Sequence, residues 1–253
     1  MSKFELSVES LGFSRKDLGP RLLKAALAEG IAVLLFVFIG AGAVIVSTQD
    51  GLTLNAVIII ALAHGLGFAT LVAMTAKISG GHVNPVVTFA AALTGRMKIG
   101  PGAVYIGAQL VGAVLGALLL QVVLVGEVEG ALGAHGGPSA AVDGVSAAVV
   151  IEAVLTFVLV FVVFATAMDA KKGLGHVAPL FIGLAILIDN FVGVPLTGAS
   201  MNPARSFGPA LVAGEWLDNW YDWLAIYVAG PAIGDSLAGV VYMLAFWDRE
   251  EDA

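Results

Sequence analysis

Two Asn-Pro pairs are the residues of this sequence best placed to build a polar site. The stretches "SGGHVNPVVTFAAAL" (79–93) and "TGASMNPARSFGPAL" (197–211) share a Gly before the Asn, a Phe after it and a closing Ala-Leu. Asn is among the strongest helix N-caps, and Pro is favoured at the first helical position. Asn84-Pro85 and Asn202-Pro203 are therefore each expected to begin a helix.

An Asn that caps a helix with its side-chain oxygen keeps its amide N–H groups for another partner. Two such helix starts, brought together, would present two donors and two positive dipole ends, each of about +0.5 charge. That field repels a cation and suits a neutral molecule with an acceptor oxygen. A lone Asn-Pro pair is most simply a loop turn, but two copies in matched surroundings favour one shared site.

The composition restricts the chemistry that surrounds this site. Of the 253 residues, 59% are hydrophobic and 12% are charged, against about 25% charged in soluble domains. The chain is therefore expected to be a membrane protein. It has no Cys and four His, which excludes thiol chemistry and argues against a metal site. No nucleophile or acid pair converges, so an enzyme is not expected, and the sparse basic residues argue against nucleic acid.

Six apolar runs are long enough to cross a bilayer, which takes about 20 residues in a helix. They are 22–48, 54–76, 102–125, 145–168, 177–195 and 223–247. The two Asn-Pro runs, 84–94 and 202–213, are shorter. At about 1.5 Å per residue each measures roughly 16 Å, half of the apolar thickness. We therefore predict two half-helices that enter the membrane and end near its middle.

The basic residues indicate how the spans are oriented. With the N-terminus in the cytoplasm and six spans, all of the 12 Lys and Arg residues except Arg205 fall on the cytoplasmic side. Cytoplasmic loops are where Lys and Arg concentrate in membrane proteins. We therefore expect both termini in the cytoplasm. Arg205 is the exception that needs an explanation, and snorkelling toward water or an ion pair would be the simplest ones.

An internal repeat extends beyond the two motifs. "AEGIAVLLFVF" (28–38) is similar to "IEAVLTFVLVF" (151–161), and "YIGAQLVGAVLG" (105–116) to "YVAGPAIGDSLA" (227–238). Three spans per copy is an odd number, so the second copy must be inverted, as in other transport folds. The predicted divisions are a tail (1–21), a first repeat (22–125), an outer loop (126–144), a second repeat (145–247) and a tail (248–253).

These features resemble the aquaporin (major intrinsic protein) family over residues 20–247. The double Asn-Pro-Ala motif carries the resemblance, although the first copy has Val86 in place of Ala. It implies an all-α fold of six transmembrane helices and two re-entrant half-helices, and a passive channel that conducts water while excluding protons and ions. It also implies a homotetramer in the lipid bilayer, no cofactor, and a pore centre at Asn84 and Asn202.

The resemblance also maps a selectivity filter onto this chain. Its four members would be His64, Asn190, Ala199 and Arg205, with His135 as a loop residue that reaches the filter in a subset of vacuolar members. His64 and "HVAPLFIGLAI" resemble the tonoplast aquaporins, whereas Asn190 departs from their pattern. Arg205 would be a barrier to protons and cations. A solvated loop position is the alternative for His135.

Further positions refine this interpretation. Glu29 and Glu152 lie inside apolar runs and are expected to support the pore by accepting N–H groups from the loops before each half-helix, with Gln109 acting likewise. In the family pattern Ser206 and Ala210 favour a water channel over a glycerol channel, and Val228 stands where most members have Trp. Asp235 has no counterpart in the family pattern. It would either face a neighbouring subunit or be protonated.

Several functions remain open at this point. Besides water, the channel could pass ammonia, hydrogen peroxide or other small neutral solutes, because Asn190 is shorter than the His of strict water channels. A glycerol or ammonia facilitator, a secondary active transporter and a non-conducting structural protein are the alternatives. The expected location is the cell membrane, with a vacuolar-type membrane as the other possibility.

Overall fold

The computed structural model describes residues 11–13, 17, 19–124, 131–169 and 171–247. Within these residues every regular element is helical. Most of the predicted tails, 1–21 and 248–253, and part of the outer loop lie outside the described residues. The all-α prediction is confirmed.

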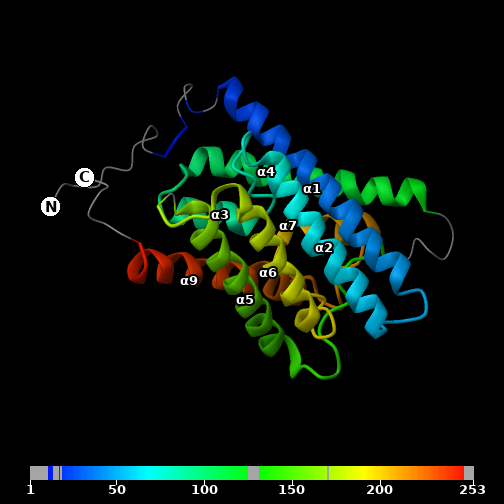
Figure 1. The fold of residues 1–253 in the computed structure, drawn as a ribbon. Coiled ribbons are helices and arrows are strands. Elements are labelled where there is room, and N and C mark those ends of the chain that lie inside the picture. The colour runs from blue at the N-terminus through cyan, green and yellow to red at the C-terminus, as the bar shows by residue number, and fades with distance from the viewer. Residues whose placement is uncertain (1–10, 14–16, 18, 125–130, 170, 248–253) are drawn as a thin grey trace.

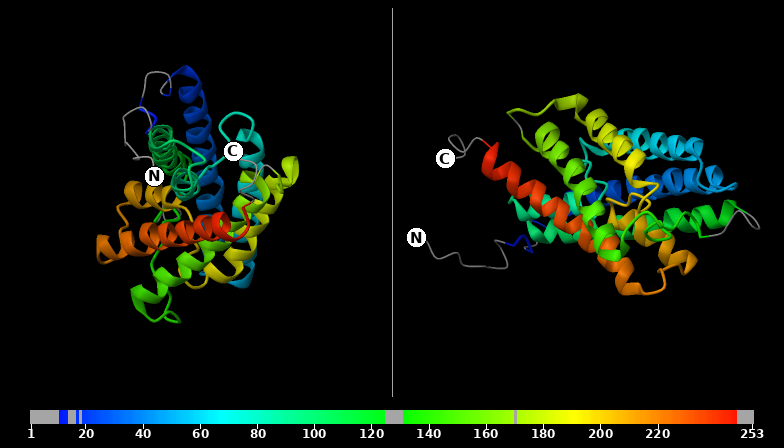
Figure 2. Two further views of the ribbon diagram at one scale, coloured as in Figure 1. Left: turned by 90° about the vertical axis from the view of Figure 1, so that its left-hand side faces the viewer. Right: turned by 90° about the horizontal axis from the view of Figure 1, so that it is seen from below.

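Six helical segments are long and apolar enough to span a membrane, close to the runs that the sequence indicates. The first repeat supplies α1 (Pro20–Ser47), α2 (Leu54–Thr75) and α4 (Ile99–Val123). The second supplies α5 (Gly144–Val163) with the π-helical turn η2 (Phe164–Met168), then η3 (Gly175–Val177) with α6 (Ala178–Gly193), and finally α8 (Trp220–Leu224), η4 (Ala225–Ala229) and α9 (Gly230–Ala245). Figure 1 shows the bundle, and Figure 2 shows from two further directions that its long helices are inclined to one another.

Two short helices interrupt this pattern, α3 (Pro85–Leu93) and α7 (Pro203–Ala213). They correspond to the expected half-helices, and they contact each other and the long helices around them. Each is about 14–17 Å long, too short to cross a bilayer alone. We call the membrane face at which α1 begins and α9 ends the near face, and the opposite one the far face. Helix α3 runs from the centre toward the near face, and α7 toward the far face.

Glycines let the outer helices of each repeat approach closely. A Cβ on Gly112 of α4 would overlap the carbonyl oxygen of Gly30 in α1, and a Cβ on Gly234 of α9 would overlap that of Ala153 in α5. Small residues at such contacts are the usual means of packing helices within a membrane. The two contacts occupy equivalent places in the two repeats, so the internal repeat extends to the packing of the helices.

Candidate functional site

The two Asn residues of the repeat cap the two half-helices. The side-chain oxygen of Asn84 accepts the N–H of Val86 (3.0 Å), and that of Asn202 accepts the N–H of Ala204 (3.1 Å). Both side chains are buried. These bonds satisfy N–H groups that have no partner within their own helix, and they hold each Asn oxygen toward its own half-helix.

The amide nitrogens of the same residues connect the two halves. Asn84 Nδ2 donates to the carbonyl oxygen of Met201 (2.8 Å), and Asn202 Nδ2 donates to that of Val83 (3.0 Å). An amide nitrogen carries two hydrogens, so each Asn keeps one N–H after this crossed pair of bonds. Both Asn residues line the same small cavity. The geometry therefore leaves two donors for a molecule that passes between them.

Buried carboxylates hold the loops that precede the half-helices. Glu29 accepts the backbone N–H groups of His82 (2.9 Å) and Val83 (2.6 Å). Glu152 does the same for Ser200 and Met201, both at 2.9 Å. Both carboxylates are fully buried. Each satisfies backbone groups that would otherwise be costly to bury in the membrane.

These loops carry unusual backbone angles. Val83, Ala199 and Met201 have φ of 53°, 55° and 50°, a region that branched and bulky residues rarely adopt. Val83 and Met201 occupy equivalent places before the two Asn residues, and it is their carbonyl oxygens that accept the crossed bonds. The left-handed conformation is therefore part of what turns these oxygens toward the centre, and the carboxylates stabilise it.

Arg205 lies one turn into α7 and is buried. Its Nε donates to His64 Nε2 (3.3 Å), and its Nη1 donates to the carbonyl oxygen of Gly133 (2.7 Å). His64 Nδ1 is 2.9 Å from the carbonyl oxygen of Ile60. His64 therefore donates through Nδ1 and accepts through Nε2. Arg205 is held by neutral acceptors and does not snorkel to water.

His135, from the loop between α4 and α5, joins the same cluster. Its Nε2 lies 3.3 Å from Arg205 Nη1, and its ring stacks on Tyr227 with 4.7 Å between centroids. Burial, and then the positive charge of Arg205, lowers the pKa of His135 well below its usual value. Neutral His135 can accept a hydrogen bond from the guanidinium, which a protonated ring could not. Its side chain is buried, so it is not a solvated loop residue.

Asn190 and Ala199 complete the predicted ring. Asn190 Nδ2 donates to the carbonyl oxygen of Ile186, one turn earlier in α6 (2.7 Å). Its Oδ1 has no partner among the described residues. Both Asn190 and Ala199 line the cavity that also contains His64, Asn84 and Asn202. Asn190 therefore lines this cavity with an acceptor that no described residue satisfies, while one of its two amide hydrogens is used within its own helix.

The cavity itself is very small. It measures about 10 Å³, close to the lower limit of about 10–15 Å³ for one water molecule. The rest of its wall is mostly apolar, namely Phe36, Phe68, Leu159, Ile186 and Met201 together with Ser200. A narrow space with a few polar groups on an apolar wall is suited to small molecules that pass one at a time.

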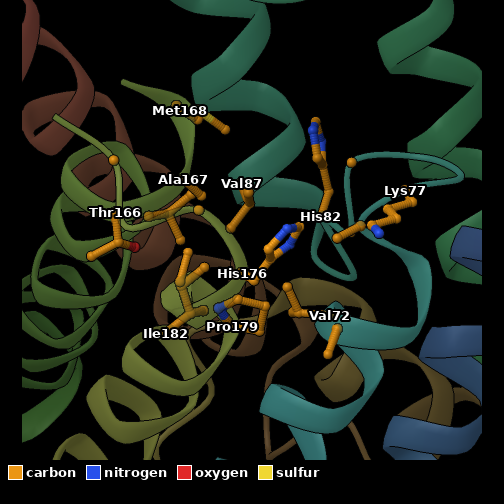
Figure 3. Close-up of a pocket in the computed structure, with 18 of the residues that line it drawn as sticks. Val72, Lys77, His82, Val87, Thr166, Ala167, Met168, His176, Pro179 and Ile182 are labelled. Atoms are coloured by element: carbon orange, nitrogen blue, oxygen red, sulfur yellow. The ribbon is translucent and has the colours of Figure 1, made fainter. Parts of the chain in front are cut away.

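A wider vestibule of about 640 Å³ opens on the near face. Figure 3 shows Lys77, His82 and His176 lining it together with apolar residues such as Val72 and Ile182. His82 Nδ1 is 3.0 Å from the hydroxyl oxygen of Thr88 in α3. The vestibule thus leads from the near face toward the two Asn residues.

The structure adds features that sequence reasoning missed or assigned wrongly. Gln109 does not accept loop N–H groups; its Nε2 donates to Glu29 (2.9 Å). Asp235 is fully buried within its own chain, so it does not face a neighbouring subunit. The Gly133 carbonyl and Asp189, which is buried beside Asn190 in α6, were not foreseen. Neither belongs to the repeat motifs, so no spacing signal marked them.

The fold and site together define a transmembrane channel. Two inverted triplets of helices bring two half-helix N-termini to one narrow polar space, and a buried Arg stands on its far side. No group of His, Cys, Asp or Glu in the described residues could hold a metal ion.

Comparison with known proteins specifies the class. Residues 18–242 match the family model described as "Major intrinsic protein". The chain is similar to "Aquaporin TIP4-4" of Zea mays (42% identity, 96% of this chain and 92% of that protein) and to "Probable aquaporin TIP2-1" of Oryza sativa subsp. japonica (46%, 87% and 86%). In fold it is similar to the aquaglyceroporin from Plasmodium falciparum (TM-score 0.78, 21% identity, 88% and 96%). The chain belongs to the major intrinsic protein family and is a passive water channel, not an enzyme.

Proposed function

We propose that water passes in single file through the space between the Asn pair and Arg205, with ammonia and hydrogen peroxide as further permeants. The observation that carries this proposal is the cavity of about 10 Å³ that Asn84, Asn202, His64 and Asn190 line. Asn84 and Asn202 supply N–H donors, and the Oδ1 of Asn190 is an acceptor without a partner in the part of the chain that the structure describes. A permeant that both donates and accepts hydrogen bonds replaces its lost hydration there.

Size and polarity separate the candidates. The cavity is close to the size needed for one water molecule, so a glycerol facilitator is the less favoured alternative despite the aromatic wall at Phe36. A secondary active transporter would need a coupling-ion site, and Arg205 with the two helix dipoles makes this space unfavourable for cations. Arg205 and the dipoles are proposed to exclude protons and ions.

The role of Asn190 follows from its orientation. Its Oδ1 is the acceptor in the ring that no other described residue satisfies. A solute with N–H donors, such as ammonia, gains a hydrogen bond there that a His in the same place would offer only through an unprotonated ring nitrogen. Asn190 is therefore proposed to set the ratio of ammonia to water flux.

Purified parent and Asn190→His protein in lipid vesicles test this assignment. Water flux is measured by stopped-flow light scattering, ammonia flux by an internal pH dye, and glycerol flux serves as the size control. We expect fast water and measurable ammonia flux in the parent, and a several-fold lower ammonia-to-water ratio in the variant. An unchanged ratio would remove Asn190 from the filter, and rapid glycerol flux would contradict the size argument.

The assembly and location are proposed on less direct grounds. We propose a homotetramer with one pore per subunit, because family membership implies it. The near face is proposed to be cytoplasmic, because the basic residues lie there. Relatives of the TIP type favour a vacuolar membrane over the cell membrane. The divisions at 22–125 and 145–247 are proposed as the two repeats.

A further inference from the structure

A second cavity lies on the outside of the bundle, away from the pore. It measures about 650 Å³ and is formed by α3, α4, α7 and the last span. Its walls are almost entirely hydrocarbon. The lining residues are Pro85, Val86, Phe89, Ile106, Leu110, Pro203, Phe207, Trp216, Trp220, Trp223, Leu224, Val228 and Ala232. We call this cavity the lateral groove.

The lateral groove begins at the far face and reaches just past the membrane centre. One end lies at Phe89 of α3, one turn beyond Pro85; Pro85 and Pro203 are the first residues of the half-helices, which begin near the membrane centre. The other end lies at Trp220, which is 66% exposed at the start of α8 on the far face. Trp is enriched at the membrane–water interface. From Trp220 to Ala232 the helix rises about 18 Å, close to the roughly 15 Å thickness of one leaflet.

The far-face end of the groove is acidic. Glu215 and Asp218 lie in the segment that leads into α8, and Asp222 lies in the first turn of α8. Residues 131–143 and 214–222 contain no Lys or Arg. Trp220 and Tyr221, whose side chains are exposed, are neighbours of these acidic residues in the sequence. Carboxylates and aromatic faces together attract a quaternary or primary ammonium and repel an anionic headgroup. The surroundings therefore distinguish among lipids by their headgroup charge.

We propose that the lateral groove binds one acyl chain of a far-leaflet phospholipid whose headgroup carries an ammonium. The groove reaches from the far face to the membrane centre, as an acyl chain of that leaflet does, its wall matches a hydrocarbon chain, and its acidic, aromatic mouth matches the headgroup. This inference does not depend on which solute the pore conducts. A second copy of the chain seated in the groove is the competing occupant, and the experiment below distinguishes the two.

A bound chain would act on the filter through a row of aromatic rings. Trp223 forms part of the groove wall, and its ring lies 6.0 Å from that of Tyr227. Tyr227 stacks on His135, which contacts Arg205. A chain that fills the groove removes the void behind Trp223, because an empty space leaves its lining without contacts on one side. The bound acyl chain would therefore support the position of His135 through Trp223 and Tyr227.

The test uses the full-length protein in nanodiscs with a photoreactive lipid. Phosphatidylcholine and phosphatidylglycerol probes carry the same diazirine-labelled acyl chain, and labelled residues are mapped by mass spectrometry. Val228→Trp and Ala232→Phe each fill the groove, whereas Val241→Trp places a bulky side chain on the lipid-exposed part of α9 outside it. Retained water permeability and circular dichroism show that each variant is folded.

We expect phosphatidylcholine to label groove residues such as Leu224 several-fold more than phosphatidylglycerol does. Val228→Trp and Ala232→Phe should reduce that labelling several-fold, and Val241→Trp should leave it unchanged. Phosphatidylcholine should also raise the melting temperature of the parent but not of Val228→Trp. Equal labelling by both lipids, no effect of either filling variant, or a groove protected by cross-links to a second copy would each overturn the proposal.

Discussion

The Glu152→Gln variant tests whether a single carboxylate shapes the pore. Both oxygens of Glu152 are used: Oε1 accepts the Thr197 hydroxyl (2.7 Å) and the Ser200 N–H (2.9 Å), and Oε2 accepts the Met201 N–H (2.9 Å). Gln keeps one acceptor oxygen but places an NH₂ group against the remaining N–H. One charge-assisted hydrogen bond is therefore lost and a buried donor is left unpaired.

The expected loss of stability follows from the one hydrogen bond that is lost. A hydrogen bond to a charged group contributes about 1.5–3 kcal/mol, so the free energy of unfolding should fall by about 2–3 kcal/mol. For a chain of this length that corresponds to a decrease of about 5–10 °C in melting temperature. Water permeability per folded protein should fall as well, because Met201, whose carbonyl accepts from Asn84, is no longer held in its left-handed conformation.

The assay combines differential scanning fluorimetry in detergent with stopped-flow swelling of vesicles. Glu215→Gln is the matched control, because Glu215 is exposed and should change neither quantity. Glu29→Gln should repeat the effect in the other half, since Glu29 holds His82 and Val83 in the same way. If Glu152→Gln melted at the parent temperature and conducted water at the parent rate, the carboxylate would not be what holds this loop.

Three further predictions concern the filter and the packing. Arg205→Val should admit protons or cations because the fixed charge is lost. A proton leak measured with an internal pH dye checks this. If the variant excluded protons as well as the parent does, the barrier would be assigned to the helix dipoles alone. Gly112→Ala should cost about 1–3 kcal/mol, since its Cβ overlaps the Gly30 carbonyl; Gly107→Ala, in open space on the same helix, should not lower the melting temperature. Because the pKa of His135 lies well below its usual value, its ring stays neutral as the pH falls, and only below that lowered pKa should protonation oppose Arg205. Protonation of His135 should therefore cause no change in water permeability between about pH 7 and 5. A change in water permeability centred near pH 6.5 that His135→Ala abolishes would contradict this.

Much of the architecture could be predicted from the sequence because membrane constraints are strong. Apolar length sets the spans, and an Asn-Pro pair sets a helix start, so the six spans and two half-helices needed no tertiary information. The role of Glu29 also followed, since a buried loop in a membrane needs an acceptor. The contacts of Arg205 did not follow. Its partner Gly133 contributes a backbone oxygen from a loop outside the repeat, and nothing in the type of that residue indicates such a contact.

The two repeats are most alike where they hold the backbone and least alike where they select the permeant. Glu29 and Glu152 perform the same task, and Asn84 and Asn202 donate to each other's loop. On the far side of the Asn pair, however, Arg205 occupies the place that Val87 has in the first repeat. A barrier to cations needs only one such charge, because the two helix dipoles already act from both sides. A second Arg in the near half would place another unpaired charge in the membrane, which is costly. The two repeats are therefore alike in the residues that hold the backbone, and the residue that repels cations, Arg205, lies in one half of the pore only.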